Sequence, residues 1–333
     1  MKKKYVFRIV FTVVCVLSAV CLLHGTSFAK SPSKLKVQGT TLVDENGKII
    51  QLKGISTHGL SWFPEYVNKN SFKYMKKKWK INTVRLAMYT SDYNGYCTGD
   101  AANKSRLLKL IDDGVKYATD AGLYVIIDWH ILNDNNPMEH KKESISFFKK
   151  MAKKYKNYSN VLYEICNEPN GGTNWSTIKS YSESVISKIR KYDKDAVVIV
   201  GTPTWSQDVD LAAADRLSSK YGNVMYTLHF YAATHGEFLR DKAGKALDAG
   251  LPLFVSEFGI CDASGNGGIS KAEAAKWFKL LNERHVSMVA WNLSNKNESS
   301  AFIKPECKKL TGWKNSDLSE SAKWIIKQYK KMK

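Results

Sequence analysis

Short apolar runs alternate along the chain with stretches in which apolar residues repeat at helical spacing. The runs are almost continuously apolar, which is typical of strands that are buried on both faces. They cover residues 52–58, 83–89, 124–130, 161–167, 196–202, 224–231, 253–257 and 287–293. Because a helix pattern follows each run, this order predicts an α/β fold whose parallel strands close into a barrel.

Further elements flank this predicted (β/α)8 TIM barrel. Apolar pieces at 35–37, 41–43 and 49–52 surround turn residues at 44–47, and this pattern predicts a short N-terminal β-hairpin. We expect the hairpin to cap the barrel floor. Near the other end, apolar residues at helical spacing between 322 and 329 predict a closing helix, which a capping box from Asp317 to Glu320 would begin.

The first 29 residues have the features of a secretory signal peptide. Three lysines and Arg8 precede an apolar segment at 9–23, and small residues lead up to Ala29, after which we expect cleavage. An uncleaved membrane anchor is the alternative, but the apolar segment is shorter than the ~20 residues that span a bilayer. We therefore expect a secreted, extracellular protein with no membrane association after cleavage.

Basic residues outnumber acidic ones by 51 to 31, which gives a formal net charge of +20. Cleavage after Ala29 would remove four positive charges and leave +16. The lysines are spread over the predicted helices and form no stripe interleaved with aromatic residues, so we do not expect nucleic-acid binding. Outside the signal peptide, Cys97, Cys166, Cys261 and Cys307 are too few and too scattered for a disulfide framework, which leaves one bridge as an open alternative.

Polar and aromatic side chains stand where the apolar runs end. A parallel barrel gathers the carboxyl ends of its strands at one mouth, so we expect these residues to meet there. Two of them are Glu168 and Glu257, and such a pair suits a general acid that faces a nucleophile during cleavage of a glycosidic bond. The others are His58, Arg85, His130, Asn167, His229, Tyr231 and Trp291.

Seven sequence blocks, in barrel order, resemble glycoside hydrolase family 5, and within it the secreted bacterial endo-β-1,4-glucanases. The blocks are STHGLSW at 56–62, VRLAMY at 84–89, IDWHIL at 127–132, YEICNEPN at 163–170, HFY at 229–231, SEFG at 256–259 and WNLSNK at 291–296. They cover nearly all of residues 30–333. Because the chain ends about one helix after the eighth run, we expect residues 30–333 to form a single catalytic domain with no appended carbohydrate-binding module.

The resemblance implies that Glu168 is the general acid/base and Glu257 the nucleophile of a retaining mechanism. Electrostatics supports this division of roles. Arg85 beside Glu257 would favour the ionised nucleophile, whereas a drier setting next to Asn167 would raise the pKa of Glu168.

Other roles are implied by the same resemblance. Asn167 would bind the 2-hydroxyl of the sugar at the cleavage point, His130 and His229 would surround the carboxyls, and Tyr231 would donate to the nucleophile. The substrate-binding residues implied are His58, Trp62, Tyr89, Trp205, Trp291, Lys296 and Glu298, with Trp291 beneath the sugar at the cleavage point and Trp205 on the leaving-group side. Trp62 and Trp205 as core aromatics, and His58 as a structural histidine, are the alternatives.

Residues 262–273 follow the ligand spacing of an EF-hand-type calcium loop. Asp262, Ser264, Asn266 and Glu273 supply oxygens at the expected intervals, and a glycine stands at the sixth place. However, two of these residues are uncharged, and Ser270 with Glu273 makes an ordinary capping box. We therefore expect chemistry without a cofactor, with calcium in this loop as the alternative.

The sequence thus predicts a secreted endo-1,4-β-glucanase that hydrolyses cellulose or mixed-linkage β-glucan and acts as a monomer. A β-mannanase or xylanase on the same barrel is the alternative among enzymes, since the fold does not fix the substrate. A non-catalytic protein that binds cell-wall polysaccharide is the alternative from another class. The intact pair of glutamates favours the enzyme.

Overall fold

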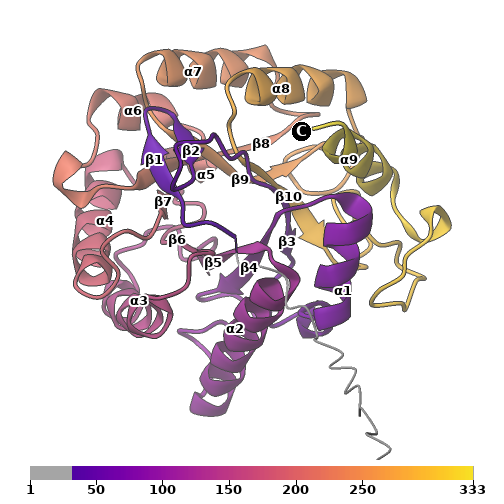
Figure 1. The fold of residues 1–333 in the computed structure, drawn as a ribbon, viewed down its shortest axis with the longest axis horizontal. Coiled ribbons are helices and arrows are strands. Elements are labelled where there is room, and N and C mark those ends of the chain that lie inside the picture. The colour runs from indigo at the N-terminus through magenta and orange to yellow at the C-terminus, as the bar shows by residue number, and fades with distance from the viewer. Residues whose placement is uncertain (1–31, 333) are drawn as a thin grey trace, which may run out of the picture.

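Eight parallel strands close into a barrel in the order β10-β3-β4-β5-β6-β7-β8-β9 (Figure 1). The computed structural model describes residues 32–332, so the predicted signal peptide at 1–29 lies outside the described residues. The strands are β3 (Lys53–Thr57), β4 (Thr83–Tyr89), β5 (Tyr124–His130), β6 (Val161–Glu164), β7 (Val198–Val200), β8 (Val224–Tyr231), β9 (Leu253–Gly259) and β10 (Met288–Leu293). Each overlaps one predicted run, and the predicted (β/α)8 barrel is confirmed.

Helices surround the barrel (Figure 1), and several of them begin at a side-chain cap. The helices are α1 (Lys69–Tyr74), α2 (Ala101–Ala121), α3 (Lys141–Tyr155), α4 (Trp175–Arg190), α5 (Pro203–Ser206), α6 (Val209–Ala214), α7 (Glu237–Asp248), α8 (Lys271–Glu283) and α9 (Glu320–Lys331), with short turns η1 (Pro64–Tyr66), η2 (Met75–Trp79), η3 (Ser219–Tyr221) and η4 (Asn315–Asp317). Asp100 begins α2 by accepting the N–H of Asn103 at 2.7 Å. Gly122 ends it with a φ of 67°, which glycine adopts without a steric penalty.

In the described part of the chain, buried apolar residues form three clusters, and the two larger ones lie on either side of the barrel wall. The larger of these two lies between strands and helices, and every residue of β4 and β5 is buried, as expected for strands covered on both faces. A smaller cluster fills the barrel at the amino ends of the strands, where Leu52, Tyr124, Leu162 and Phe254 pack together. The floor is therefore closed by side chains, and the opposite end carries the polar residues.

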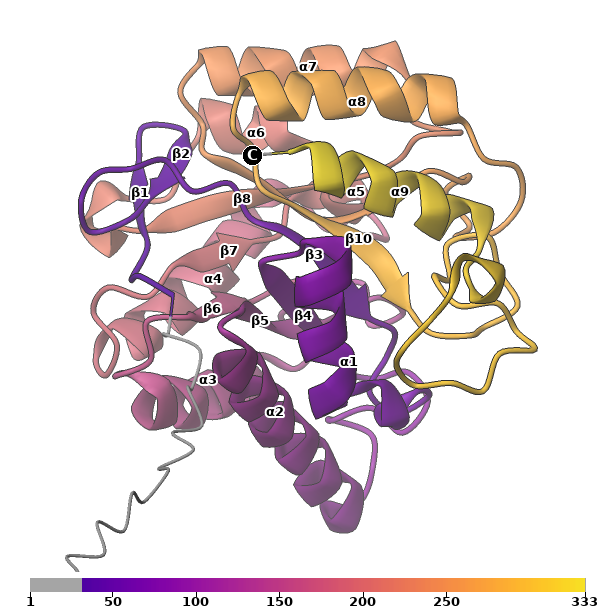
Figure 2. The ribbon, with the colours of Figure 1, turned by 45° about the vertical axis from the view of Figure 1, so that its right-hand side comes forward.

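The N-terminal hairpin covers this floor, as predicted. Strands β1 (Lys36–Gln38) and β2 (Thr41–Val43) pair antiparallel, and Leu35 and Leu42 join the floor cluster. Figure 2 shows the hairpin at the end of the barrel away from the arrowhead of β10. The predicted turn at 44–47 is confirmed, because Asp44 donates its N–H to the carbonyl of Lys48 at 2.9 Å and Val43 forms an antiparallel bridge with Ile49. The chain also reverses once more, between β1 and β2 at Gly39, where φ is +58°.

The start of the closing helix also differs from the prediction. Ser319 is the N-cap of α9 and accepts the N–H of Ala322 at 3.1 Å. Asp317 belongs to the preceding turn, where its carboxylate accepts the N–H of Lys314 at 2.8 Å and pairs with Lys309. The predicted capping box from Asp317 to Glu320 is therefore wrong, and the N-cap is two residues later. The Asp317 carboxylate is occupied by the N–H of Lys314 and by the ammonium group of Lys309.

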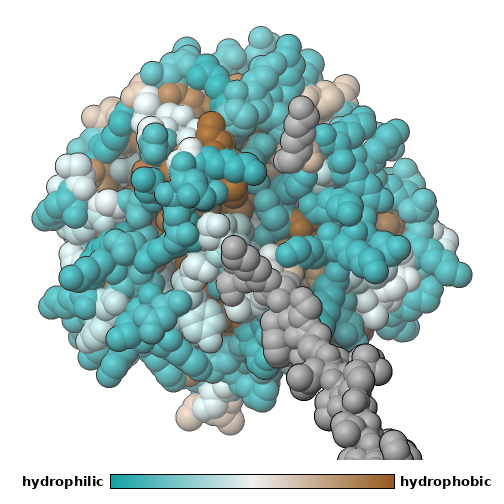
Figure 3. Space-filling view, in the orientation of Figure 1, coloured by the Kyte–Doolittle hydropathy of each residue, from teal (hydrophilic) through white to brown (hydrophobic). Residues whose placement is uncertain are grey.

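The face in Figure 3 is covered largely by hydrophilic residues, as expected for a chain rich in lysine. Within residues 32–332, none of the helices has the length and apolar character that crossing a membrane requires. Cys97, Cys166, Cys261 and Cys307 are all free thiols, so the single bridge left open by the sequence does not form.

Candidate active site

A cavity of about 940 Å³ opens at the carboxyl ends of the barrel strands. It is lined by twelve of the residues singled out from the sequence for catalysis or substrate binding: His58, Trp62, Tyr89, His130, Glu168, Trp205, His229, Tyr231, Glu257, Trp291, Lys296 and Glu298. Arg85 and Asn167 do not line it and are fully buried. Each contacts a lining residue: Arg85 lies 3.1 Å from Glu257, and Asn167 lies 3.2 Å from His130. The expected contact of Asn167 with the 2-hydroxyl of the sugar stays a prediction.

The register of the strands determines which site residues are neighbours. Tyr89 on β4 pairs with His130 on β5, and His229 on β8 pairs with Glu257 on β9. One layer deeper, Asp128 pairs with Glu164 on β6. The strands thus present an upper layer around the cavity and a lower layer of buried charged groups.

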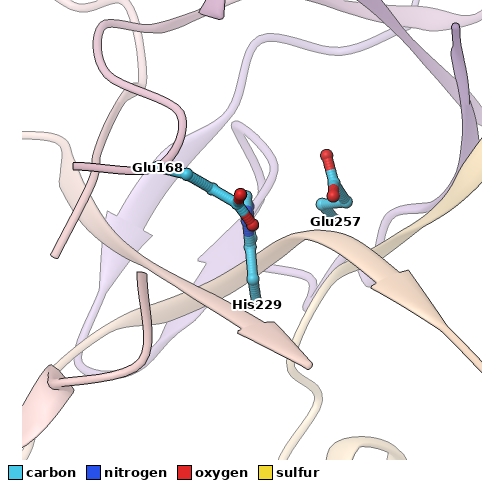
Figure 4. A group of neighbouring side chains, drawn as sticks. All are labelled: Glu168, His229 and Glu257. Carbon is cyan, nitrogen blue, oxygen red and sulfur yellow. The ribbon is translucent and has the colours of Figure 1, made fainter. Parts of the chain in front are cut away.

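Glu168 and Glu257 face each other across this upper layer. Glu257 lies on β9, and Glu168 lies in the segment that follows β6. One carboxylate oxygen of each lies within 4.8 Å of the other and of a ring nitrogen of His229. Figure 4 shows the Glu168 carboxyl meeting the His229 ring, with the Glu257 carboxyl apart from both. The arrangement leaves room for a reacting atom between the two carboxyl groups.

The Glu257 carboxylate is held by two donors. Tyr231 donates its hydroxyl to Oε1 at 2.7 Å, and Arg85 donates from NH1 to Oε2 at 3.1 Å. Burial, followed by the Glu168 charge, raises the pKa of Glu257, whereas His229, Arg85 and His130 lower it. Because hydrogen bonds to both oxygens favour the ionised form, Glu257 is suited to act as a nucleophile once Glu168 is neutral.

Glu168 has a different environment. Burial raises its pKa to about 8, while the Arg85 charge opposes this effect. Its Oε1 lies 2.8 Å from Nδ1 of His229, whose own pKa burial lowers to about 4. Between these two values His229 is neutral and Glu168 is protonated, which is the state that a general acid needs.

Arg85 connects the site to the layer beneath it. Its guanidinium donates to Glu164 through Nε at 2.7 Å and through NH2 at 3.0 Å, and it also pairs with Asp128 at 3.1 Å. All three side chains are fully buried. Neither acid was singled out from the sequence, although an acidic residue inside a continuously apolar run is a signal that could have found both.

Asn167 and His130 form a second fixed group beside Arg85. Asn167 Oδ1 accepts from Arg85 at 2.6 Å, and its amide nitrogen donates to the backbone carbonyl of Ile131 at 3.0 Å and contacts His130 Nε2 at 3.2 Å. His130 Nδ1 in turn lies 2.5 Å from Asp128. Burial, followed by Arg85, lowers the pKa of His130 well below its usual range, so the ring is neutral. Asn167 is thereby held in one orientation at the base of the site.

Aromatic rings form the walls of the cavity. Trp291 stacks on His130 with ring centroids 5.3 Å apart, and it lies 5.2 Å from His58. Trp62 packs edge to face on Tyr89 at 4.6 Å. Flat apolar faces of this kind, beside polar groups, are suited to binding rings that carry hydroxyls.

Trp205 lies on the other side of the cavity and is 46% exposed, so the core alternative does not hold for it. It occupies the left-handed region of the backbone, with φ of 54°, as do the residues on both sides. Its N–H donates to the carbonyl of Pro169 at 3.0 Å, and Ser206 donates to the carbonyl of Asn167 at 2.6 Å. Backbone of this kind costs about 1–3 kcal/mol per residue and persists only where surrounding contacts impose it.

The rim of the cavity near Lys296 and Glu298 is polar. Lys296 pairs with Glu298 at 2.6 Å, and Asn292 donates to the same carboxylate at 2.8 Å. Lys296 Nζ also approaches Nε2 of His58 at 3.5 Å, and burial together with this charge lowers the pKa of His58 to about 3. His58 is therefore a neutral ring that both lines the cavity and packs against its neighbours.

The oxygens of the candidate calcium loop are largely engaged by protein donors. Glu273 pairs with Arg240 at 2.6 Å and with Lys276 at 2.7 Å, and Asn266 Oδ1 accepts the N–H of Ser299 at 3.1 Å. Asp262 accepts from the backbone and the hydroxyl of Ser264. Ser270 is the N-cap of α8, as predicted. Ser264 lines the cavity, so this loop forms part of its rim.

Several lining residues were not found from the sequence. They are Phe63, Asp92, Leu132, Gln207, His235, Ala263 and Gly265. Most lie on loops after the strands, where no periodic pattern marks a position as facing the cavity. Phe63 and Leu132 were within or next to the recognised blocks and could have been included on that basis.

Comparison with known proteins agrees with this site. Residues 43–297 match the family model for cellulase, glycosyl hydrolase family 5. Endoglucanase A of Butyrivibrio fibrisolvens is 48% identical over 301 residues, which are 90% of this chain and 69% of that protein. An endoglucanase of Clostridium saccharobutylicum is 48% identical over 303 residues, which are 91% of this chain and 65% of that protein. The chain thus spans about two thirds of the length of these relatives.

Solved structures give the same result. The cellulase Cel5C_n superposes with a TM-score of 0.83 at 46% identity, covering 89% of this chain and 91% of that one. The catalytic domain of Thermobifida fusca endoglucanase Cel5A, solved with cellotetraose, superposes with a TM-score of 0.82 at 36% identity, covering 89% and 97%. A (β/α)8 barrel with two facing carboxyls in an aromatic cavity is the arrangement that glycoside hydrolases use. This chain belongs to glycosyl hydrolase family 5, with cellulases as its relatives.

Proposed function

We propose that the chain is a secreted endo-1,4-β-glucanase that hydrolyses internal bonds of β-glucan with retention of configuration. The observation that carries this proposal is that one carboxylate oxygen of Glu168 lies within 4.8 Å of one carboxylate oxygen of Glu257, inside an aromatic cavity. Retaining glycosidases hold their carboxyl groups ~5–5.5 Å apart, whereas inverting ones need ~6.5–9.5 Å to admit a water molecule. The short approach supports retention.

The first step of this mechanism forms a glycosyl ester. The Glu257 carboxylate attacks the anomeric carbon, and the bond to the leaving oxygen breaks with its electron pair. The leaving oxygen takes the proton of Glu168. Tyr231 and Arg85, which donate to Glu257, orient the attacking carboxylate and limit its basicity. Trp291 and Trp205 lie on either side of the cavity, where they are suited to hold the two sugars that flank the bond.

The second step releases the sugar. Water attacks the anomeric carbon and gives a proton to the Glu168 carboxylate, while the ester bond to Glu257 breaks and returns its electron pair to that carboxylate. Both glutamates are then in their starting states. The cycle needs no redox partner, because both steps are substitutions at the anomeric carbon and Glu168 transfers only a proton.

We further propose that the chemistry uses no metal and that the loop at 262–273 is closed by its own hydrogen bonds. Arg85 already supplies a positive charge to Glu257, and Glu273 is held by Arg240 and Lys276. Thermal melts in excess calcium and in chelator test this point, with identical midpoints expected. A calcium-dependent rise in the midpoint that Asp262→Ala abolishes would contradict it.

Activity on several polymers tests the proposed function as a whole. We expect turnover of carboxymethylcellulose and lichenan to exceed turnover of mannan and xylan, with a rapid fall in viscosity that marks internal cleavage. Preference for mannan or xylan would instead assign the barrel to a mannanase or xylanase. Binding without hydrolysis of any of the four would favour a non-catalytic wall-binding protein. Light scattering of the pure protein would test the proposed monomer.

A further inference from the structure

A continuous chain of hydrogen bonds leads from Glu168 away from the cavity. Glu168 Oε1 lies 2.8 Å from His229 Nδ1, and His229 Nε2 lies 3.0 Å from the hydroxyl of Ser256. The Ser256 hydroxyl donates to Glu164 Oε1 at 2.7 Å. Ser256 and Glu164 are fully buried, and His229 is 1% exposed. The chain therefore joins the acid of the site to a buried carboxylate without passing through solvent.

Arg85 determines the charge of the last member of the chain. It donates to both oxygens of Glu164, and the Ser256 hydroxyl adds a third donor. Burial raises the pKa of Glu164, and the two bonds from Arg85 oppose this effect. Because a bidentate guanidinium pair and a hydroxyl all donate to it, Glu164 acts as a carboxylate that only accepts.

Because Glu164 can only accept, it determines which atom donates in each of the other hydrogen bonds of this chain. A serine hydroxyl has one proton, and its bond to Glu164 at 2.7 Å is shorter than its 3.5 Å contact with Thr227. Ser256 Oγ can then only accept from His229, so the ring carries its proton on Nε2. Burial lowers the pKa of His229 to about 4, so near neutral pH the ring has one proton and Nδ1 is bare.

We propose that Ser256 and Glu164 are positioning residues that fix His229 as the Nε2–H tautomer, so that its bare Nδ1 accepts the acid proton of Glu168. This inference rests on the proposed glycosidase mechanism and deepens it. Before the first step, the contact at 2.8 Å is favourable only when Glu168 is protonated. After the proton has moved to the leaving oxygen, the Glu168 carboxylate faces a lone pair, which makes it a stronger base toward water.

Other charged and titratable groups surround Glu168 and His229, and several of them also influence the pKa values of these two residues. The surrounding groups are Arg85 and Tyr89 on β4, Asp128 and His130 on β5, Glu164 on β6, Tyr231 on β8 and Glu257 on β9. The nearest of them to His229 Nε2 is Glu164, whose Oε1 lies 3.9 Å away, beyond hydrogen-bond distance, while Ser256 lies at 3.0 Å and is the hydrogen-bond partner of this nitrogen. A change confined to Ser256 therefore alters the tautomer while it leaves these charges in place.

Nitrogen NMR of the wild-type protein tests the tautomer directly. The full sequence contains seven histidines, so the protein is labelled with nitrogen-15 histidine and its spectrum is compared with that of His229→Gln. The signals that are missing from the variant belong to His229. At pH 6 we expect Nε2 to give the shift of a protonated ring nitrogen and Nδ1 that of an unprotonated one. The opposite pattern, or protons on both nitrogens, would overturn the proposal. This measurement needs no activity and no substituted Ser256.

The pH profile of Ser256→Ala supplies the functional test. Ser256→Ala removes the hydrogen-bond acceptor of Nε2–H, and Glu164 Oε1 is too far away at 3.9 Å to replace it. We therefore expect the ring to change to the Nδ1–H tautomer and to donate to the Glu168 carboxylate. The alkaline limb of kcat/KM should then move down by about one pH unit, the size expected when a hydrogen bond begins to favour the charged form. Thr227→Val is the matched control, because it removes a buried hydroxyl from the same layer but lies outside the chain. Its alkaline limb should match the wild type.

The outcomes separate this inference from the proposed function. A lower kcat for Ser256→Ala with an unmoved alkaline limb would make Ser256 a merely structural residue and overturn the inference, while hydrolysis by the wild type would still support the glucanase. Wild-type protein without hydrolysis on any β-glucan would instead overturn the proposed function. In that case the NMR experiment would still decide the tautomer.

Discussion

Arg85, which is fully buried beneath the cavity, donates at 3.1 Å to Glu257, which lines the cavity. The same guanidinium pairs with Asp128 and Glu164, so one positive charge balances three acidic groups. The proposed nucleophile is thus part of a buried network whose stability depends on a single residue.

Arg85→Met should destabilise the fold strongly. The substitution keeps a similar volume but leaves buried carboxylates without their partner, which typically costs about 3–5 kcal/mol. Activity should fall as well, because Glu257 loses the donor that keeps it ionised. Denaturant unfolding measures the change in free energy. Arg284→Met, which breaks an exposed pair with Asp248, is the control and should change stability little. Equal small effects for both would contradict the proposed role of the network.

The raised pKa of Glu168 should make the free energy of unfolding depend on pH. Burial raises this pKa to about 8 from the ordinary value of 4.5 for a glutamate, so between these two pH values the folded state binds a proton that the unfolded state has lost. Stability therefore decreases as pH rises through this window. Glu168→Gln cannot titrate, so its stability relative to the wild type should increase from pH 4 to pH 9. A constant difference between the two proteins across this range would show that Glu168 titrates normally.

Trp205 should contribute to binding on one side of the cleaved bond. Trp205→Ala removes an exposed ring that lines the cavity, and we expect kcat/KM on soluble oligosaccharides to fall by about tenfold, equivalent to ~1.4 kcal/mol. Phe238→Ala is the matched control, because Phe238 is 60% exposed but does not line the cavity. Steady-state kinetics should show no change for this control. A similar loss in both variants would place the effect outside substrate binding.

The two glutamates should respond differently to substitution and to azide. Glu257→Ala should lose activity, and azide should restore turnover with an inverted glycosyl azide, because a small anion can occupy the space left by the nucleophile. Glu168→Ala should instead retain activity on dinitrophenyl glycosides, whose leaving group needs no protonation, and azide should give a retained product. Glu237→Ala on the exposed start of α7 is a control that should behave as the wild type. Exchanged phenotypes would reverse the roles assigned to the pair.

The barrel could be predicted because parallel strands that are covered on both faces consist almost entirely of apolar residues. Glu168 and Glu257 could be found because each stands at the carboxyl end of such a run. Glu164, Asp128 and Ser256 lie inside the runs, and their importance depends on partners far away in sequence: Arg85 for the two acids and Glu164 for Ser256. A local pattern does not show such a partner.

Local signals also failed where two interpretations were equally good. Asp317 and Ser319 can both begin a helix, and only the contact with Lys309 directs the aspartate to the preceding turn. The turn at 44–47 could be predicted from its residues, whereas the reversal at Gly39 between β1 and β2 rests on a single glycine and was not singled out. Trp205 owes its position to left-handed backbone that no sequence pattern marks.

The stereochemistry of the first product tests the central claim most directly. Proton NMR can follow the anomeric signals during hydrolysis of a soluble cello-oligosaccharide, before mutarotation mixes the two forms. The short approach of Glu168 and Glu257, within 4.8 Å, predicts that the β-anomer appears first and the α-anomer only later. Initial release of the α-anomer would contradict the double displacement and the assignment of Glu257 as nucleophile.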